Sequence, residues 1–438
     1  MSTSLLKHLH AQVQRQQLPY LKFGRIRSIT GLLIEATGVD AAVGELCYIF
    51  SDEGTPIKAE VVGIRQGSIL LMPLDEPIGL RAGCLIRPTA SPLTIPVGRA
   101  LLGRVIDAGG HPLDGKGPLM LSETQPVHQV PPSPLERQLI EKPLRTGVRA
   151  IDTFLTLGQG QRTGIFAGSG VGKSTLLGMI ARKASADVNV IALIGERGRE
   201  VQEFIVDNLG EEGLARSVVV AVTSDQAAMN RVKGASTATA IAEYFRDQGL
   251  NVLLMMDSVT RVAMAQREIG LATGEPPTTR GYTPSVFALL PRLLERAGAG
   301  PQGTITGIYT VLVDGDDFNE PIGDAVRGIL DGHIVLSRKL AQANHFPAID
   351  ILQSVSRVMP RLVPPEYLQI VSEARSLLAT YREAEDLIRI GAYKAGSDPA
   401  LDRAIAVYEP LTRFLKQGVD EPCPDNPWEE LAKILQHT

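Results

Sequence analysis

The stretch TGIFAGSGVGKSTLLGMIARKA, residues 163–184, decides the fold of this chain. Its apolar start, TGIFA, runs into the glycines Gly168, Gly170 and Gly172, and a helical pattern follows at once. Glycines let successive backbone N–H groups turn inward at the N-terminus of a helix, which creates a nest for anions. The stretch therefore predicts a strand, a phosphate-binding loop (P-loop) and a helix.

The predicted loop ends in two functional side chains. The amine of Lys173 would neutralise the β- and γ-phosphates of a nucleotide, and the hydroxyl of Ser174 would supply an oxygen ligand to Mg²⁺. Ala167 stands where the usual pattern has glycine, which is tolerable if its φ is negative. A glycine-rich turn that precedes Lys-Ser by chance is the alternative, and the strand-to-helix context argues against it. The expected nucleotide-binding residues of the loop are Ala167, Gly168, Ser169, Gly170, Val171, Gly172, Lys173, Ser174 and Thr175.

Outward from the loop, β-rich runs alternate with helical patterns. The runs are VNVIALI, SVVVAVT, NVLLMMD and GIYTVLV, and the helical patterns include TATAIAEYFRDQ. Such alternation predicts a parallel sheet with crossover helices, which we place at residues 147–360.

The flanks differ from this centre. Residues 24–92 give short β-rich runs with glycines at the turns, which predict a small antiparallel β-barrel. Residues 93–146 are punctuated by Pro and Gly and are interpreted as a connector. Residues 361–438 carry apolar residues three or four apart, which predict a helical domain. The expected fold class is a multidomain α/β protein.

Local signals also occur in the C-terminal helical domain and in the first residues of the chain. In the helical domain, Asp398 is a candidate N-cap, Pro399 suits the first helical position and Gly418 suits the exit of that helix. Residues 1–23 carry apolar residues at helical spacing in a polar stretch, enough for one narrow stripe. A frayed tail, a helix lying on the barrel and a docking helix all fit this spacing.

Composition excludes several classes of protein. The 438 residues carry 44 Lys and Arg against 48 Asp and Glu, a formal charge of −4, so no basic excess predicts non-specific binding to nucleic acid. The sequence lacks an apolar stretch long enough for a membrane helix and the apolar core of a signal peptide, so we expect a cytoplasmic protein. Three cysteines without CxxC spacing argue against a disulfide framework and a zinc site.

Two acids follow predicted strands of the central sheet. Asp257 ends the run NVLLMMD, where it could hold Mg²⁺ through water or, alternatively, cap the next helix. Glu196 follows VNVIALI and could orient water against the γ-phosphate, or form a structural ion pair with Arg197.

Longer strings resemble one family. LIGERGREVQEF, LLMMDSVTRVAMAQREIGLATGEPP, GYTPSVFALLPRLLERAG, DGHIVLSRKLA and PAIDILQSVS are similar to the flagellar and injectisome export ATPases, and the match spans residues 24–420. These proteins are relatives of the rotary ATP synthase subunits, and PAIDILQSVS resembles the signature of that superfamily. The resemblance implies a barrel, a RecA-like P-loop ATPase domain and a helical domain, with ATP and Mg²⁺ as cofactors.

The resemblance also assigns roles to residues. Lys173, Ser174, Glu196 and Asp257 match the phosphate, magnesium and catalytic positions, in agreement with their separate interpretation. Arg357 matches the arginine that the family inserts into a neighbouring subunit's site, although the sequence alone would make it a surface arginine.

Three further positions match site residues of the catalytic ATP synthase subunit. Arg197 and Arg261 match site arginines. Phe346 falls where an aromatic residue stacks on adenine, although an apolar Phe could equally pack in a core.

An arginine that acts in trans implies a ring. One chain holds both Glu196 and Arg357, so identical copies can complete each other's sites in a homohexamer. The resemblance further implies a stator-like regulator on the N-terminal helix (1–23), a coiled-coil stalk protein, an export gate, and export substrates or their chaperones. It implies peripheral association with the inner-membrane export apparatus.

The strings VDGDDFNEPIGDAVRGILDGHIVLSRKLA and DLIRIGAYKAGSDPALDRAI look more like flagellar members than injectisome ones, so the resemblance implies a hexameric ATPase that assists flagellar protein export. Three alternatives to the flagellar interpretation remain. An injectisome ATPase differs from it by a modest margin in sequence. A nucleic-acid motor like Rho would carry basic and aromatic residues interleaved in its front domain, and residues 24–92 lack that density. A non-catalytic subunit would lack the carboxylate that Glu196 supplies.

Overall fold

The structure, a computed structural model, describes residues 22–51, 54–313 and 320–436. Its contacts divide the chain into two compact units, with the boundary after Leu93. The predicted regulator-binding segment therefore lies almost wholly outside the described residues. Among the described residues, no helix is long and apolar enough to cross a membrane.

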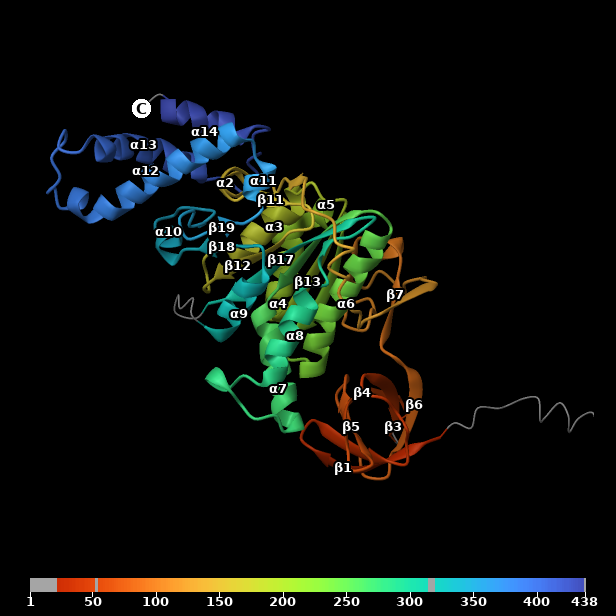
Figure 1. Ribbon diagram of the computed structural model, residues 1–438. Coiled ribbons are helices and arrows are strands. Elements are labelled where there is room, and N and C mark those ends of the chain that lie inside the picture. The colour runs from red at the N-terminus through yellow and green to blue at the C-terminus, as the bar shows by residue number, and fades with distance from the viewer. Residues whose placement is uncertain (1–21, 52–53, 314–319, 437–438) are drawn as a thin grey trace, which may run out of the picture. The chain divides into compact units, whose positions relative to one another are not determined.

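The first unit is a closed antiparallel barrel, as the sequence predicts (Figure 1). Its alternating side chains bury Ile34, Ile49, Val61, Leu71 and Ile86, none of them more than 1% exposed. Around the barrel the strands follow the order β1 (Gly24–Thr30), β2 (Leu33–Thr37), β5 (Ser68–Pro73), β4 (Ile57–Arg65), β3 (Glu45–Phe50) and β6 (Leu85–Pro92).

The second unit is built on a nine-stranded sheet. The strand that precedes the P-loop, β12 (Arg162–Ala167), lies between two parallel neighbours, β17 (Thr304–Leu312) and β18 (Gly332–Leu336). The sheet continues through β15 (Asn251–Asp257), β13 (Val188–Glu196), β14 (Ser217–Thr223) and β8 (Arg104–Ile106), with the short antiparallel strands β19 (Val355–Ser356) on β18 and β16 (Gly298–Ala299) on β17.

The predicted connector adds structure of its own. Strand β8 extends the central sheet, and β7 (Thr94–Val97) pairs with β9 (Glu123–Pro126) in a separate ribbon. A second small ribbon joins β10 (Pro143–Leu144) to β11 (Leu157–Gly158).

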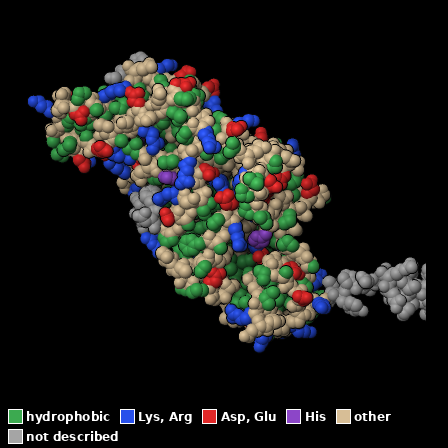
Figure 2. All heavy atoms as spheres, in the orientation of Figure 1, with side chains coloured by type: hydrophobic (Ala, Val, Ile, Leu, Met, Phe, Trp, Pro, Cys, Tyr) green, Lys and Arg blue, Asp and Glu red, His purple; other side chains and the backbone are tan. Residues whose placement is uncertain are grey.

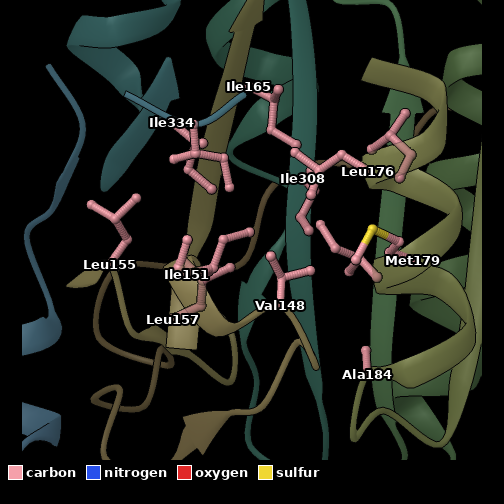
Figure 3. Packing of buried hydrophobic residues seen from close by; sticks show 14 of the residues in the cluster. Val148, Ile151, Leu155, Leu157, Ile165, Leu176, Met179, Ala184, Ile308 and Ile334 are labelled. Atoms are coloured by element: carbon pink, nitrogen blue, oxygen red, sulfur yellow. The ribbon is translucent and has the colours of Figure 1, made fainter. Parts of the chain in front are cut away.

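Helices cover the central sheet. Leu176 and Met179 of α3 point toward Ile165 of β12 and Ile308 of β17 (Figure 3). The sheet's helices are α2 (Arg149–Phe154), α3 (Lys173–Lys183), α4 (Gly198–Glu203), α5 (Gly210–Ala215), α6 (Ala228–Asp247), α7 (Val259–Thr273), α8 (Pro284–Leu294), α9 (Pro321–Ile329) and α10 (Arg338–Gln342), with the helical turns η1 (Arg99–Leu101), η2 (Phe204–Leu209) and η3 (Thr279–Gly281).

The C-terminal part is helical, as predicted, and comprises α11 (Met359–Leu362), α12 (Pro365–Arg389), α13 (Pro399–Leu415) and α14 (Pro427–Gln436). Asp398 caps α13, because its carboxylate accepts hydrogen bonds from the backbone of Ala400 and Leu401 at 2.9 and 3.3 Å. The predicted exit at Gly418 is wrong. The helix ends at Leu415, because the backbone N–H of Gln417 instead donates to the carbonyl of Phe346 at 3.0 Å.

The surface agrees with the charge balance of the sequence. On the face drawn in Figure 2, Lys and Arg side chains are interspersed with Asp and Glu. This mixture matches a chain with 44 cationic and 48 anionic side chains.

Candidate active site

The P-loop turns from β12 into α3 with the backbone that the glycine pattern predicts. Gly170 and Gly172 have φ values of 74° and 87°, in the left-handed region that disfavours other residues, and Gly172 is the N-cap of α3. Ala167 is the last residue of β12, and its φ is not positive. A methyl group is therefore tolerated where the usual pattern has glycine.

Lys173 lies between two carboxylates. Its Nζ contacts Oδ1 of Asp257 and lies 3.6 Å from Oε1 of Glu196. Burial acts to lower the pKa of Lys173, but the two negative charges outweigh it and the pKa is raised. The amine is thus a fixed positive charge beside the loop.

Asp257 is placed at the carboxyl end of β15 with its side chain buried. Its Oδ1 accepts a hydrogen bond from the Thr310 hydroxyl at 2.7 Å, in addition to the contact with Lys173. The capping alternative for Asp257 is wrong, because the N-cap of α7 is Ser258, whose hydroxyl accepts from the backbone N–H of Arg261 at 3.3 Å.

Glu196 ends β13, the strand beside β15. Because Leu193 pairs with Asp257, the two acids lie at the same edge of the sheet. The Glu196 side chain is only 12% exposed, and burial, reinforced by the charge of Asp257 and opposed by Lys173, raises its pKa to about 7. The alternative, a structural ion pair between Glu196 and Arg197, is not what the structure shows, since the Arg197 side chain is 79% exposed and lies 3.8 Å from Glu200.

The Arg261 side chain packs closely against Gly195 and lines the same cavity as Glu196. Gly195 has a φ of 72°, and a Cβ on it would lie 3.0 Å from Cβ of Arg261. The cavity, about 420 Å³ in volume, is lined by residues 167–170 and 172–175 together with Glu196, Arg197, Glu200, Arg261, Leu312 and Val313. Most of the predicted phosphate-site residues are therefore brought together.

A second, mainly apolar cavity of about 350 Å³ adjoins the loop. Phe346 lies beside Gly172, where an added Cβ would be 3.4 Å from its ring, and it is 42% exposed. A buried core role for Phe346 is therefore wrong. The other lining residues are Gly172, Thr175, Leu176, Met179, Pro347, Gln417, Gly418 and Val419.

Some lining residues were missed by the sequence interpretation. Leu312 and Val313 have a recognisable signal, since they lie at and directly after the carboxyl end of β17, which borders the phosphate cavity. Gln417 and Val419 have no such sequence signal, because only the fold brings these residues, which follow α13, to the loop.

Arg357 is the one predicted site residue far from the loop of its own chain. It follows β19, which pairs with the amino end of β18 through Ser356 and Gly332, whereas the loop follows the carboxyl end of β12. The register places Gly332 level with Thr163, about 13 Å along the strand from the loop. The side chain of Arg357 is exposed.

Comparisons with known proteins agree with this architecture. Residues 26–90 match the β-barrel domain and 147–356 the nucleotide-binding domain of the ATP synthase alpha/beta family, and 363–433 match the C-terminal domain of the T3SS EscN ATPase. These matches confirm the predicted fold class.

Individual relatives cover nearly the whole chain. The flagellum-specific ATP synthase of Bacillus subtilis (strain 168) is 59% identical, with 92% of this chain and 93% of that protein aligned. The type 3 secretion system ATPase of Xanthomonas euvesicatoria is 53% identical over 91% of each chain. The assembled ATPase EscN of enteropathogenic E. coli is 50% identical, with a TM-score of 0.89, and the alignment covers 94% of this chain and 100% of the chain in that structure.

The predicted ATPase class is thereby confirmed, and with it nucleotide binding. At such identity over nine tenths of its length, the chain belongs to the family of flagellum-specific ATP synthases and type 3 secretion system ATPases.

Proposed function

We propose that this protein hydrolyses ATP at the P-loop site and that hydrolysis assists protein export by a flagellar type III apparatus. The observation that carries the chemistry is the group formed by Lys173, Glu196 and Asp257 at one sheet edge, directly beside the loop. A fixed cation and two buried acids beside a phosphate nest are what phosphoryl transfer to water requires.

Each residue has a distinct role in this proposal. Backbone N–H groups of the loop and the amine of Lys173 hold the phosphates, and Arg197 and Arg261 add positive charge to the same cavity. Glu196 orients the attacking water and polarises it, and its pKa of about 7 suits proton transfer near neutral pH. The adenine base packs against Phe346 in the apolar cavity.

The residues also fit Mg²⁺. The Ser174 side chain lines the cavity and the Asp257 carboxylate faces Lys173 beside it, so both offer the oxygen donors that this ion prefers. Ser174 would bind the ion directly and Asp257 through water. The ion would neutralise charge on the phosphate oxygens when bound.

Hydrolysis is tested by two substitutions. We expect Glu196→Gln to bind ATP but to lower kcat by about 10²- to 10⁴-fold, because it loses only the group that activates water. Lys173→Ala should instead lose nucleotide affinity. Full hydrolysis by purified Glu196→Gln protein would refute the assignment of the base.

Assembly follows from the position of Arg357. Arg357 follows a strand pair whose level lies about 13 Å along β12 from the chain's own loop, so we infer that it acts on another copy, which favours a homohexamer with ATP at its interfaces. The structure of EscN is described as assembled, and a second one as a complex with its central stalk EscO. Specific activity should therefore rise with protein concentration, and an activity per chain that is constant at all concentrations would contradict this.

The flagellar role is favoured over the injectisome by identity. Flagellum-specific ATP synthases match at 59% and 56%, and three others at 49–50%, whereas type 3 secretion system ATPases match at 53%, 52% and 49%. The support for the flagellar role therefore comes from the first two relatives. In this role the protein works in the cytoplasm at the inner-membrane export gate, with a stator-like regulator, a stalk protein, and export substrates or their chaperones as partners. Recovery of the intact protein from cell extract with injectisome components, and without flagellar regulators, would overturn it.

A further inference from the structure

A buried glutamine lies directly before the P-loop strand. Gln161 is 0% exposed, and its Oε1 accepts a hydrogen bond from the backbone N–H of Gly158 at 2.9 Å. Its Nε2 donates to the carbonyl of Asp331 at 3.4 Å and to the hydroxyl of Ser356 at 3.2 Å. Every polar atom of this carboxamide therefore has a partner.

Both acceptors of Gln161 adjoin Arg357. The carbonyl of Asp331 also accepts the backbone N–H of Arg357 at 3.0 Å, and Ser356 is the preceding residue. The Ser356 hydroxyl in turn donates to the carbonyl of Thr156 at 2.8 Å. One buried amide thus bonds two groups on the amino-terminal side of Arg357, namely the carbonyl that accepts its backbone N–H and the hydroxyl of the residue before it.

Asp331, whose carbonyl accepts the backbone N–H of Arg357, also bonds Arg162, the first residue of β12. Its carboxylate accepts from Nε and from the backbone N–H of Arg162, both at 3.1 Å, and its own N–H donates to the Arg162 carbonyl at 2.8 Å. At the other end of this six-residue strand stands Ala167 of the P-loop. A short, buried strand therefore separates the phosphate site of the chain from the backbone of Arg357.

Strands β18 and β19 approach each other closely at Gly332. A Cβ on Gly332 would lie 2.5 Å from the carbonyl of Val355 and 3.3 Å from Nε2 of Gln161. By contrast, the guanidinium of Arg357 is exposed, and it has no hydrogen-bond or ion-pair partner within residues 22–51, 54–313 and 320–436. A fixed backbone with a projecting side chain suits contact with a group outside the chain.

We propose that Gln161 is a positioning residue for the neighbouring active site. Its hydrogen bonds to Asp331 and Ser356 hold the backbone of Arg357, so that the guanidinium is presented in one orientation to ATP bound by the next copy. This inference rests on the proposed action of Arg357 in trans. It deepens that proposal by naming the group that aims the arginine and the strand, β12, that joins it to the chain's own phosphate site.

Two substitutions test the positioning. Gln161→Leu keeps the approximate volume and removes the carboxamide, and Ser356→Ala removes only a hydroxyl and serves if the first variant folds poorly. We expect kcat to fall about 10²-fold and 10-fold, respectively, with the KM for ATP within about twofold of wild type, because small misplacements of a transition-state group cost rate rather than binding.

A matched control separates positioning from general loss of stability. Thr304→Val removes a hydrogen bond of 2.7 Å to Asn251 at the same amino edge of the sheet, remote from Arg357. We expect its kcat to stay within about twofold of wild type even if its melting temperature falls as far as that of Ser356→Ala.

Mixed rings show whose site is affected. Lys173→Ala chains cannot use their own site but keep Gln161 and Arg357 intact. Added to Gln161→Leu chains, they should restore activity to the same fraction that they restore for Arg357→Ala chains.

Each outcome decides between the two proposals. Recovery with Arg357→Ala but not with Gln161→Leu would refute the positioning role alone, and so would a wild-type kcat for Gln161→Leu by itself. No recovery with either variant, in rings verified to be mixed, would overturn the action in trans and the positioning that depends on it.

Discussion

Glu196 is the residue on which the proposed hydrolysis depends most directly. Its carboxylate is placed at the end of β13, 3.6 Å from the Lys173 amine and close to the buried charge of Asp257. Burial raises its pKa to about 7, so near neutral pH the carboxylate can both accept and release a proton at little cost in free energy. Its protonation should therefore control both the rate and the stability of the protein.

The pH dependence of activity follows from this pKa. Since the proposed base must be ionised, kcat/KM for ATP should fall about tenfold per pH unit below pH 7 and level off above pH 8. The measurement is ATP hydrolysis from pH 5.5 to 9 with saturating Mg²⁺. In the Glu196→Gln control, the small residual activity should lack this acidic limb, and an identical limb there would assign it to another group.

Stability should change in the opposite sense. The folded-state pKa of Glu196 lies above its ordinary value of 4.5, so ionisation of Glu196 destabilises the fold at pH values above 7, and this cost disappears as the pH falls to 4.5. We therefore expect Glu196→Gln to raise the Tm of the nucleotide-free protein by roughly 2–6 °C at pH 8, and by little at pH 4.5. Calorimetry at the two pH values is the check, and a lower Tm at pH 8 would contradict it.

Residues of the phosphate site were predictable for a physical reason. Lys173 and Ser174 belong to a local motif, and Glu196 and Asp257 end two parallel strands, whose carboxyl ends must meet at one edge. Sequence spacing could not reveal the contact of Asp257 with Thr310, because it depends on the order of strands in the sheet.

At the scale of elements, residues 416–426 link the C-terminal helices to the apolar cavity beside Phe346. Arg149 at the start of α2 contacts Glu421 and donates to the Phe414 carbonyl at 3.0 Å. The Lys183 amine donates to the Glu421 carbonyl at 2.6 Å. These bonds hold Gln417 and its neighbours as one wall of the cavity beside Phe346.

Loosening this wall should weaken binding more than catalysis. We expect Glu421→Gln to raise the KM for ATP about 3- to 10-fold with little change in kcat, because it removes the charge opposite Arg149 but no group of the phosphate site. The matched control is Glu409→Gln, which breaks an exposed pair with Arg413 of 3.0 Å on α13. An equal effect of both substitutions would rule out a specific role for Glu421.

The sequence predicted element types better than element ends. Apolar periodicity distinguishes the barrel, the sheet and the helices, because buried residues repeat at different intervals in strands and in helices. The end of α13 at Leu415 was missed, because Gln417 leaves the helix to bond Phe346, Gly147 and Arg149, all distant in sequence. For the same reason β8 was invisible within the Pro- and Gly-rich connector, since it exists only as a partner of β14.

For the whole molecule, the decisive feature is that the parts of the proposed shared site lie at two opposite edges of a sheet. Lys173 and Glu196 lie at the carboxyl edge of the strands, and Arg357 lies at the opposite edge. One chain therefore holds both parts without being able to join them. In the proposed ring of identical copies, each interface would join the two parts, and hydrolysis would be a property of the assembly.

Mixing two inactive variants tests this claim most directly. Lys173→Ala and Arg357→Ala chains are combined at varied ratios, mixed rings are verified by differential labelling, and ATP hydrolysis is measured. Activity should be near zero for either variant alone and highest at intermediate ratios, because some interfaces then regain one intact site and one intact arginine. Activity that stays near zero at every ratio in verified mixed rings would contradict the shared site.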